Sequence, residues 1–165
     1  MIRGILFEYD TMIGAKAPGE PDDNLRVLAR LRRDDYKLGL YADRPVRQLQ
    51  DLPAGLLSCF VFLQGGDGAV IRGSLEDGGS AAWQPVPAEP AGGRTEVLKQ
   101  FCGLFQIDPA ETAVFSGSSL DAALLSQAGT AVSSNPALAA SADCQLPPQA
   151  GIRAACEHFG WILHE

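Results

Sequence analysis

The sequence predicts a single α/β domain with a three-layer, Rossmann-like parallel sheet and helices on both faces. Short apolar runs of strand length alternate along the chain with segments whose apolar residues recur at helical spacing. This alternation is typical of parallel sheets in which helices connect the strands. The 165 residues suffice for one domain with a core of its own, so no disulfide is needed for stability.

The first part of the chain contains three expected strands. Residues 2–9 form a short apolar run that stops at charged residues, which indicates a buried strand. A helix follows from about Pro21, because Leu25, Leu28 and Leu31 recur at helical spacing. The next expected elements are a strand at 37–41, a helix at about 45–52, a strand at 59–63 and a short β segment at 69–71.

Between residues 73 and 93 the composition shifts to Gly, Pro, Ser and Ala. Besides Leu75, the large apolar residues of this stretch are Trp83 and Val86. An unstructured loop of this length is uncommon in a compact domain, so we expect a functional flap or a small hairpin. Trp83 could pack on a partner subunit or on its own sheet.

The second half of the chain continues the alternation. Helical spacing returns at Arg94, where Val97, Leu98, Phe101 and Phe105 mark an amphipathic helix. The remaining expected elements are strands at 112–115 and 130–132, helices at 119–127, 136–141 and 149–159, and a brief edge strand at 144–146.

The cysteine pattern argues against a zinc site or a disulfide framework. The four cysteines are far apart, with no C-x-x-C pair and no histidine at ligand spacing. Buried free thiols in a reducing compartment fit this pattern, so we expect a cytoplasmic protein. The cysteines are Cys59, Cys102, Cys144 and Cys156.

The charge pattern excludes further classes. A formal net charge of −7 argues against general nucleic-acid binding, which needs clustered Lys and Arg. Four arginines lie on the helix expected after Pro21, but acids at both of its ends favour a solvated face. The amino-terminal run leads directly into Glu8 and Asp10, so we expect no signal peptide. No stretch approaches the ~20 apolar residues of a membrane span.

Candidate functional residues stand where the expected strands end. In parallel α/β sheets, sites form at the carboxyl ends of the strands, near the point where strand order reverses. Glu8 and Asp10 follow the first strand one residue apart, and strand periodicity would point both side chains to one face. The other strand ends are Ala42 and Asp43, residues 64–67 and residues 116–121.

Four stretches resemble, in order and spacing, the motifs of the haloacid dehalogenase (HAD) superfamily, and within it the sugar-phosphate phosphatase branch. The family has D-x-D-G-T after the first strand, A-T-G-R-P after the second, a Lys that opens a later helix, and G-D-x-x-N-D before a helix that ends in A-A-G. The corresponding stretches are EYDTM at 8–12, YADRP at 41–45, GRTEVLK at 93–99, and SGSSLD at 116–121 followed by QAG at 127–129. The resemblance covers nearly the whole chain and implies a HAD-like core.

The resemblance implies catalytic roles for two acids. The family's first Asp attacks phosphorus and forms an aspartyl-phosphate, and the matching residue is Glu8. Its side chain is one methylene longer, and a displacement of about 1 Å can cost ~10²-fold in rate. Asp10 matches the family's general acid and base. From the residues alone, Glu8 could equally be a solvated acid at a strand end, and Asp10 a turn or cap residue.

The phosphate-binding positions implied by the resemblance are Ala42, Asp43 and Arg94, and they are degenerate. The family's Ser or Thr hydroxyl falls at Ala42, and losing such a donor typically costs a few kcal/mol of transition-state stabilisation. The family's Lys aligns with Arg94, which keeps the charge but not the shape. A surface role for Arg94 is the alternative.

The resemblance also implies Mg²⁺, for which Glu8, the backbone carbonyl of Asp10 and Asp121 could supply three ligands. The leading acid of the last motif is replaced by Gly117, so we do not expect tight Mg²⁺ binding. Asp121 could instead serve the first turn of its helix. The family's Gly and Thr after the second acid are replaced by Thr11 and Met12. These replacements change the loop, where Met12 would fill space.

Relatives in this branch insert a cap domain after the third strand, and only about twenty residues, 73–93, take its place here. Family members without a full cap commonly form homo-oligomers in which a neighbour covers the cleft. A homo-oligomer is therefore one expectation for this chain.

Three hypotheses about function remain. Because the nucleophile, the phosphoryl hydroxyl and a metal carboxylate change together, we expect phosphatase turnover to be absent or very weak. The first hypothesis is a catalytically impaired protein that binds a ligand or a partner. The second is a slow Mg²⁺-dependent phosphatase acting on a small phosphorylated metabolite, and the third is a structural assembly protein.

Overall fold

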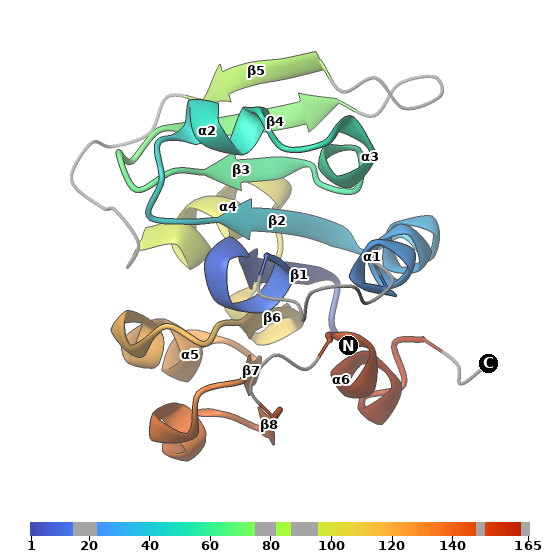
Figure 1. Cartoon of the computed structure of the whole chain (residues 1–165), viewed down its shortest axis with the longest axis vertical. Coiled ribbons are helices and arrows are strands. Elements are labelled where there is room, and N and C mark those ends of the chain that lie inside the picture. Colours follow the sequence, from blue (N-terminus) through green and yellow to red (C-terminus); the bar gives the residue numbers. More distant parts are fainter. Residues whose placement is uncertain (15–22, 75–81, 87–95, 148–150, 163–165) are drawn as a thin grey trace.

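The computed structural model describes residues 1–14, 23–74, 82–86, 96–147 and 151–162 (Figure 1). These residues form one eight-stranded sheet with the strand order β5-β4-β3-β2-β1-β6-β7-β8. The strands from β3 to β8 in that order pair in parallel, whereas β4 and β5 extend one edge in antiparallel fashion. The strands are β1 (Gly4–Glu8), β2 (Lys37–Tyr41), β3 (Phe62–Gln64), β4 (Val70–Ser74), β5 (Ala82–Val86), β6 (Thr112–Phe115), β7 (Thr130–Ser133) and β8 (Cys144–Gln145).

Helices cover both faces of the sheet, which confirms the predicted three-layer α/β class. The apolar residues of α1, α2, α3 and α6 pack into the cluster on one face, and those of α4, α5 and the 3₁₀-helix η5 into the cluster on the other. None of the described helices is both long and apolar enough to cross a lipid bilayer. The helices are α1 (Asp23–Arg33), α2 (Val46–Gln50), α3 (Ala54–Leu57), α4 (Val97–Phe105), α5 (Ala122–Gln127), α6 (Arg153–His158), and the short helices η1 (Tyr9–Ile13), η3 (Pro109–Glu111), η4 (Ser119–Asp121) and η5 (Pro136–Ser141).

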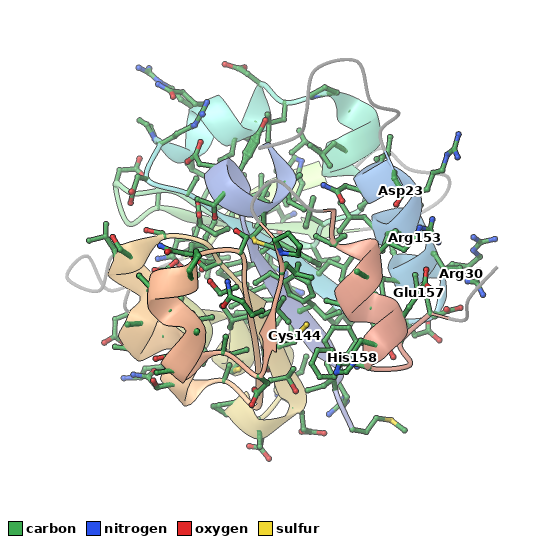
Figure 2. All side chains as sticks on the ribbon, turned by 60° about the horizontal axis from the view of Figure 1, so that its bottom comes forward. Asp23, Arg30, Cys144, Arg153, Glu157 and His158 are labelled. Atoms are coloured by element: carbon green, nitrogen blue, oxygen red, sulfur yellow. The ribbon has the colours of Figure 1, made fainter. Side chains whose placement is uncertain are left out.

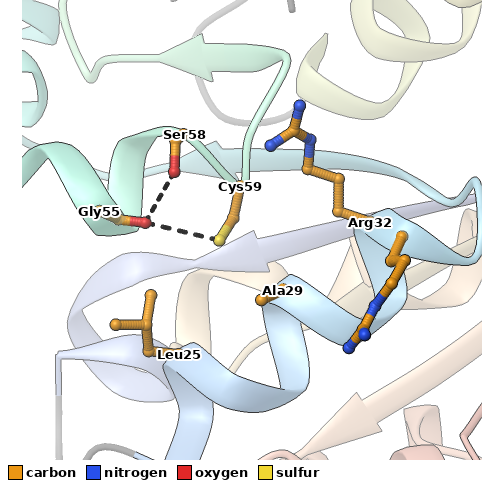
Figure 3. A pocket seen from close by; sticks show the side chains of 7 residues that line it. Leu25, Ala29, Arg32, Gly55, Ser58 and Cys59 are labelled. Atoms are coloured by element: carbon orange, nitrogen blue, oxygen red, sulfur yellow. Dashed lines mark hydrogen bonds between the residues drawn. The ribbon is translucent and has the colours of Figure 1, made fainter. Parts of the chain in front are cut away.

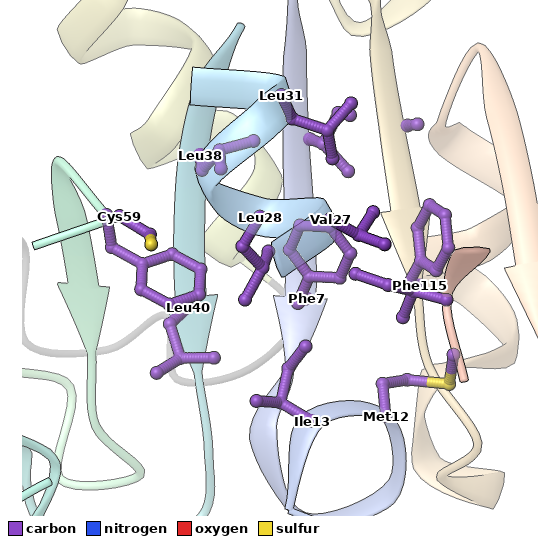
Figure 4. Packing of buried hydrophobic residues seen from close by; sticks show 14 of the residues in the cluster. Phe7, Met12, Ile13, Val27, Leu28, Leu31, Leu38, Leu40, Cys59 and Phe115 are labelled. Carbon is purple, nitrogen blue, oxygen red and sulfur yellow. The ribbon is translucent and has the colours of Figure 1, made fainter. Parts of the chain in front are cut away.

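The central strand β1 is buried on both faces, as its continuous apolar sequence predicts. Phe7 packs against Phe60 and Phe115, with ring centroids 6.3 and 4.8 Å apart respectively. Leu28 and Leu31 of α1 join the same cluster (Figure 4). Burial of this strand fixes the position of its last residue, Glu8, at the carboxyl edge of the sheet.

Three expected elements begin later than predicted. The first strand, expected at 2–9, is observed as Gly4–Glu8. The third strand, expected at 59–63, starts only at Phe62, because the backbone N–H groups of Cys59 and Phe60 bond back into the turn that ends α3. The helix expected at 149–159 is observed as Arg153–His158, and residues 148–150 lie outside the described part. Strands at 37–41 and 112–115 and the helix at 136–141 have the bounds that the sequence predicts.

The described part of the stretch 73–93 extends the sheet. β5 pairs with β4, and Trp83 stands opposite Gly73. Trp83 is half-buried and packs against the larger core cluster, so it covers its own sheet. The other residues of this stretch are largely outside the described part, and its role in place of a cap stays a prediction.

The first turn of α1 anchors the carboxyl-terminal helix. Arg153 of α6 donates from Nε and Nη2 to the carboxylate of Asp23 at 2.8 to 3.1 Å (Figure 2). This hydrogen bond lowers the pKa of Asp23. The buried Asn24 accepts from the backbone N–H of Ile152 at 2.9 Å and donates to the carbonyl of Met12 at 3.3 Å. One side chain therefore links α1, α6 and the turn that follows β1.

Candidate active site

Glu8 ends β1, and its carboxylate bends back onto the turn that follows. Residues Tyr9–Ile13 form a π-helical turn, η1, of which Glu8 is the N-cap. One carboxylate oxygen accepts a hydrogen bond from the backbone N–H of Asp10 at 2.9 Å, and the other accepts from the hydroxyl of Thr11. Glu8 is only 1% exposed. Its side chain thus stabilises its own loop, as N-cap acceptors do.

Asp10 does not extend the strand face of Glu8, although strand periodicity predicted that it would. The chain leaves the extended conformation at Tyr9, where the π-helical turn begins, so the two-residue period ends before Asp10. Asp10 Oδ1 instead accepts hydrogen bonds from Arg44 Nε at 3.0 Å and Nη2 at 2.5 Å. With 36% of its side chain exposed, Asp10 lies at the rim of the site.

Arg44 follows β2 and is held from several sides. Its guanidinium carbon lies 5.3 Å from the centre of the Tyr9 ring, within the range of a cation–π contact. The hydrogen bond with Asp10 raises the pKa of Arg44, so the guanidinium stays charged. The N–H of Gly66 donates to the Arg44 carbonyl at 2.8 Å, and a Cβ at Gly66 would collide with the carbonyl of Asp43. The close approach of these loops therefore requires glycine.

Asp121 belongs to a fully buried hydrogen-bond network. Its Oδ2 accepts from the hydroxyl of Tyr41 at 2.9 Å and from that of Ser116 at 2.5 Å. Burial, followed by the charge of Asp121, raises the pKa of Tyr41 well above its ordinary value. Tyr41 ends β2 in register with Glu8 on β1, so this network lies beside the Glu8 cap.

The predicted phosphate-binding residues Ala42 and Asp43 differ in their exposure to solvent. Ala42 is buried, and its backbone N–H donates to the carbonyl of Gln64 at 3.2 Å. Asp43 is exposed in the loop after β2. Arg94 lies outside the described residues, so its role stays a prediction.

Thr11 connects the loops at the ends of β1 and β6. Its hydroxyl donates to Glu8, and its oxygen accepts from the backbone N–H of Gly117 at 2.7 Å. Asn135, which follows β7, donates from Nδ2 to the carbonyl of Gly117 at 3.0 Å. Hydrogen bonds therefore tie together the loops after three adjacent strands.

Several of the side chains at these strand ends that could bind the Mg²⁺ ion implied by the resemblance are engaged in hydrogen bonds. Magnesium needs oxygen ligands in near-octahedral geometry, with lone pairs that point at the ion. Both oxygens of Glu8 and one oxygen of Asp121 accept hydrogen bonds from N–H or O–H groups instead. Among the residues that the structure describes, no three His, Cys, Asp or Glu side chains form a group that could hold a metal ion. The predicted set of Glu8, Asp121 and the Asp10 carbonyl contains only two carboxylates and stays a prediction.

Four residues of the site were not among the sequence predictions: Thr11, Tyr41, Arg44 and Ser116. Each lies inside one of the four motif stretches, directly next to a residue that the sequence analysis considered for the site. Tyr41 could have been found from the sheet, because it ends the strand next to Glu8. Partners of Thr11 and Arg44 depend on the turn conformation, which the sequence pattern does not give.

Two hollows lie away from this edge of the sheet. One, of about 430 Å³, lies between α1 and the residues before β3 (Figure 3). Ser58 Oγ and Cys59 Sγ both donate to the Gly55 carbonyl in its wall. The other, of about 810 Å³, lies between the end of α4 and the segment that leads into β6. Both are next to the amino ends of strands, whereas the Glu8 site is at the carboxyl ends.

No family model and no curated protein matches the amino-acid sequence. Solved structures match over nearly the whole chain. A phosphatase of the haloalkanoate (HAD) enzyme superfamily from Bacteroides thetaiotaomicron aligns with a TM-score of 0.74 at 12% identity, covering 98% of this chain and 96% of that chain. A HAD subclass IIB sugar phosphatase aligns with a TM-score of 0.70 at 13% identity, covering 97% and 100%. A haloacid dehalogenase-like hydrolase from Bacteroides thetaiotaomicron aligns with a TM-score of 0.74 at 12% identity, covering 96% and 100%.

At these identities the likeness establishes the fold. The chain has the HAD-like α/β fold, as its four motif stretches predicted. What the site at the carboxyl edge of its sheet does depends on the residues present there.

Proposed function

We propose that this HAD-like chain binds a small phosphorylated ligand at the carboxyl edge of its sheet without hydrolysing it. The observation that carries the proposal is the state of Glu8. At the position of the attacking acid stands a carboxylate whose two oxygens both accept hydrogen bonds from its own loop. Attack on phosphorus would require this buried cap to break, which leaves the donors of Asp10 and Thr11 unsatisfied.

Two further replacements support the loss of hydrolysis. Ala42 offers no hydroxyl to a phosphoryl oxygen, and Gly117 offers no carboxylate to a metal ion. Catalytic parts that act as a unit fail together, so partial retention of the set does not give partial turnover.

Arg44 supports ligand binding. A guanidinium has five N–H donors in a planar fork, of which Arg44 directs its Nε and one Nη2 N–H at Asp10. Half of its side chain is exposed, so other N–H groups can reach a ligand at the rim of the site. This fork matches the geometry of phosphate oxygens. Arg94, where the resemblance expects a phosphate-binding Lys, would add a second positive charge.

The first test is hydrolysis of para-nitrophenyl phosphate in the presence of Mg²⁺. We expect the wild-type protein and the Glu8→Ala variant to show the same background rate, because Glu8 is a structural cap. A wild-type rate that Glu8→Ala abolishes would contradict the proposal and support the slow phosphatase. Asp10, which keeps an exposed carboxylate at the rim, would then be its acid and base.

The second test is stabilisation by inorganic phosphate, measured as a rise in Tm with phosphate concentration. We expect the rise in wild type and its loss in Arg44→Gln. The control is Arg47→Gln, because it removes the same charge from an exposed residue of α2, three positions after Arg44. If phosphate does not change Tm and no hydrolysis is seen, the proposal of a phosphorylated ligand is wrong. Binding of a partner protein or assembly with further copies would then remain.

A further inference from the structure

We infer that Thr11 holds the loops after β1 and β6 together at this edge of the sheet, as a metal ion would otherwise do, and thereby excludes Mg²⁺. We call Thr11, with Glu8 and Gly117, the latch. It deepens the proposed function, because it concerns the same site and rests on the proposal that this site binds without hydrolysis. The latch is inferred from the hydrogen bonds of Thr11, whereas the proposed function is inferred from the hydrogen bonds of Glu8.

The hydroxyl of Thr11 uses both of its polarities. A hydroxyl has one hydrogen to donate and lone pairs to accept with. Thr11 donates to the carboxylate of Glu8 and accepts from the backbone N–H of Gly117 at 2.7 Å. Residues 106 positions apart in the sequence are thus joined through one oxygen atom. A cation would bridge two oxygen ligands, whereas here a hydroxyl bridges an oxygen and an N–H group.

The space beside Gly117 is filled. A Cβ atom on Gly117 would lie 2.5 Å from Ser134 Oγ and 2.9 Å from Thr11 Cβ, closer than real Cβ atoms come. An aspartate at this position, the residue that the resemblance expects, would therefore require the side chains of Ser134 and Thr11 to shift. Positions 11 and 117 are therefore coupled, because Thr11 lies next to the space that a side chain at 117 would need, and its hydroxyl accepts from the backbone N–H of Gly117.

Neighbouring residues close the latch from the side of β7. Ser134 Oγ lies 3.6 Å from the sulfur of Met12, which is itself 1% exposed. Asn135 holds the carbonyl of Gly117 at 3.0 Å, so this residue is fixed through both its N–H and its C=O. Hydrogen bonds from two neighbouring loops therefore hold Gly117 in place.

Thr11→Val tests the latch, since valine keeps the shape and removes the hydroxyl. The change leaves the Gly117 N–H and one oxygen of Glu8 without their partner, and we expect Tm to fall by roughly 4–10 °C. Thr130→Val is the matched control, because the Thr130 hydroxyl makes no hydrogen bond with any residue in the described part of the chain. Equal Tm values for the two variants would overturn the inference.

The response of Tm to millimolar MgCl₂, compared with NaCl at equal ionic strength, tests the exclusion of metal. We expect no Mg²⁺-specific rise for wild type and a lowered, Mg²⁺-independent Tm for Gly117→Asp. In the triple variant Thr11→Gly, Gly117→Asp, Ser134→Ala, which clears the space, we expect a Mg²⁺-dependent rise.

Two results would overturn the exclusion of metal. One is a Mg²⁺-specific rise in wild type that Glu8→Gln abolishes, and the other is a folded triple variant with no Mg²⁺ response. The first result in a protein that still fails to hydrolyse para-nitrophenyl phosphate would overturn the latch and leave the proposed function standing. Hydrolysis that depends on Glu8, in a protein whose Tm does not respond to Mg²⁺, would overturn the proposed function and leave the latch standing.

Discussion

At the scale of single residues, the replacement of an aspartate by Glu8 changes which groups the carboxylate can reach. The extra methylene lets the side chain fold back, so that its two oxygens meet the N–H of Asp10 and the hydroxyl of Thr11. The longer side chain, which would misplace a nucleophile, is thus suited to a cap.

The cap predicts a clear loss of stability in Glu8→Ala. The substitution removes both acceptors from a partly buried N–H and a partly buried hydroxyl, so we expect the free energy of unfolding to fall by about 1–3 kcal/mol. Urea unfolding at neutral pH measures this difference.

Glu8→Gln is the control for this prediction, because it keeps the shape and one acceptor oxygen. The amide nitrogen then faces one of the two donors, so the loss should be intermediate. A Glu8→Ala protein as stable as wild type would show that Glu8 is not a structural cap.

At the scale of elements, Asn24 is the junction between α1, α6 and the turn after β1. It accepts from Ile152 N–H and donates to the carbonyl of Met12, and it is 6% exposed. The turn that contains the Glu8 cap is therefore supported from behind by α1. Its position does not depend on the cleft residues alone.

Asn24→Ala should destabilise the protein by about 1–3 kcal/mol, since it leaves the buried N–H of Ile152 without an acceptor. Amide hydrogen exchange should show the loss first in α6, whose start this bond fixes. Asn24→Asp keeps the acceptor for Ile152 and loses the donor to Met12, so it should protect α6 better than alanine does. Gln48→Ala, on an exposed position of α2, serves as the control. Equal exchange in α6 for all variants would refute the junction.

The elements themselves were largely predictable, and the exceptions have a common cause. β2 and β6 are apolar runs of strand length, so periodicity and length determine them. The π-helical turn η1 and helix α3 were not predicted, because both are about one turn long and have too few residues for a helical period. The late start of β3 follows from α3, which uses the residues before it.

At the scale of the whole molecule, the order and spacing of degenerate motifs predicted the fold, and solved HAD-like structures confirm it. The positions of Glu8 and Asp121 at the carboxyl edge of the sheet were also predictable. Their partners were not, because the bonds of Thr11, Tyr41 and Arg44 join residues far apart in the sequence or depend on a local turn. Residue types predict where the site residues lie along the chain, whereas only the structure shows which groups they contact.

The buried acidic hydrogens of the core predict how the whole molecule responds to alkali. Burial raises the pKa of the Cys156 thiol from 9.0 to about 12, and burial raises that of Tyr41 well above 10.0. Above pH 9 the unfolded chain therefore loses protons that the folded protein keeps, so the free energy of unfolding falls as pH rises. Each group contributes up to about 1.4 kcal/mol per pH unit between its unfolded and folded pKa.

Urea unfolding of wild type, Cys156→Ala and Tyr41→Phe over a pH series from neutral to strongly alkaline measures this effect. We expect Cys156→Ala to reduce the slope of stability against pH above 9, and Tyr41→Phe to reduce it only above 10. Burial also raises the pKa of Cys59 and Cys102, so a residual slope should remain in each variant. Slopes that neither substitution changes would mean that these groups ionise alike in the folded and unfolded chain. The hydrogen bond between Tyr41 and Asp121 would then not be shielded from water, and the network beside the Glu8 cap would be open to solvent.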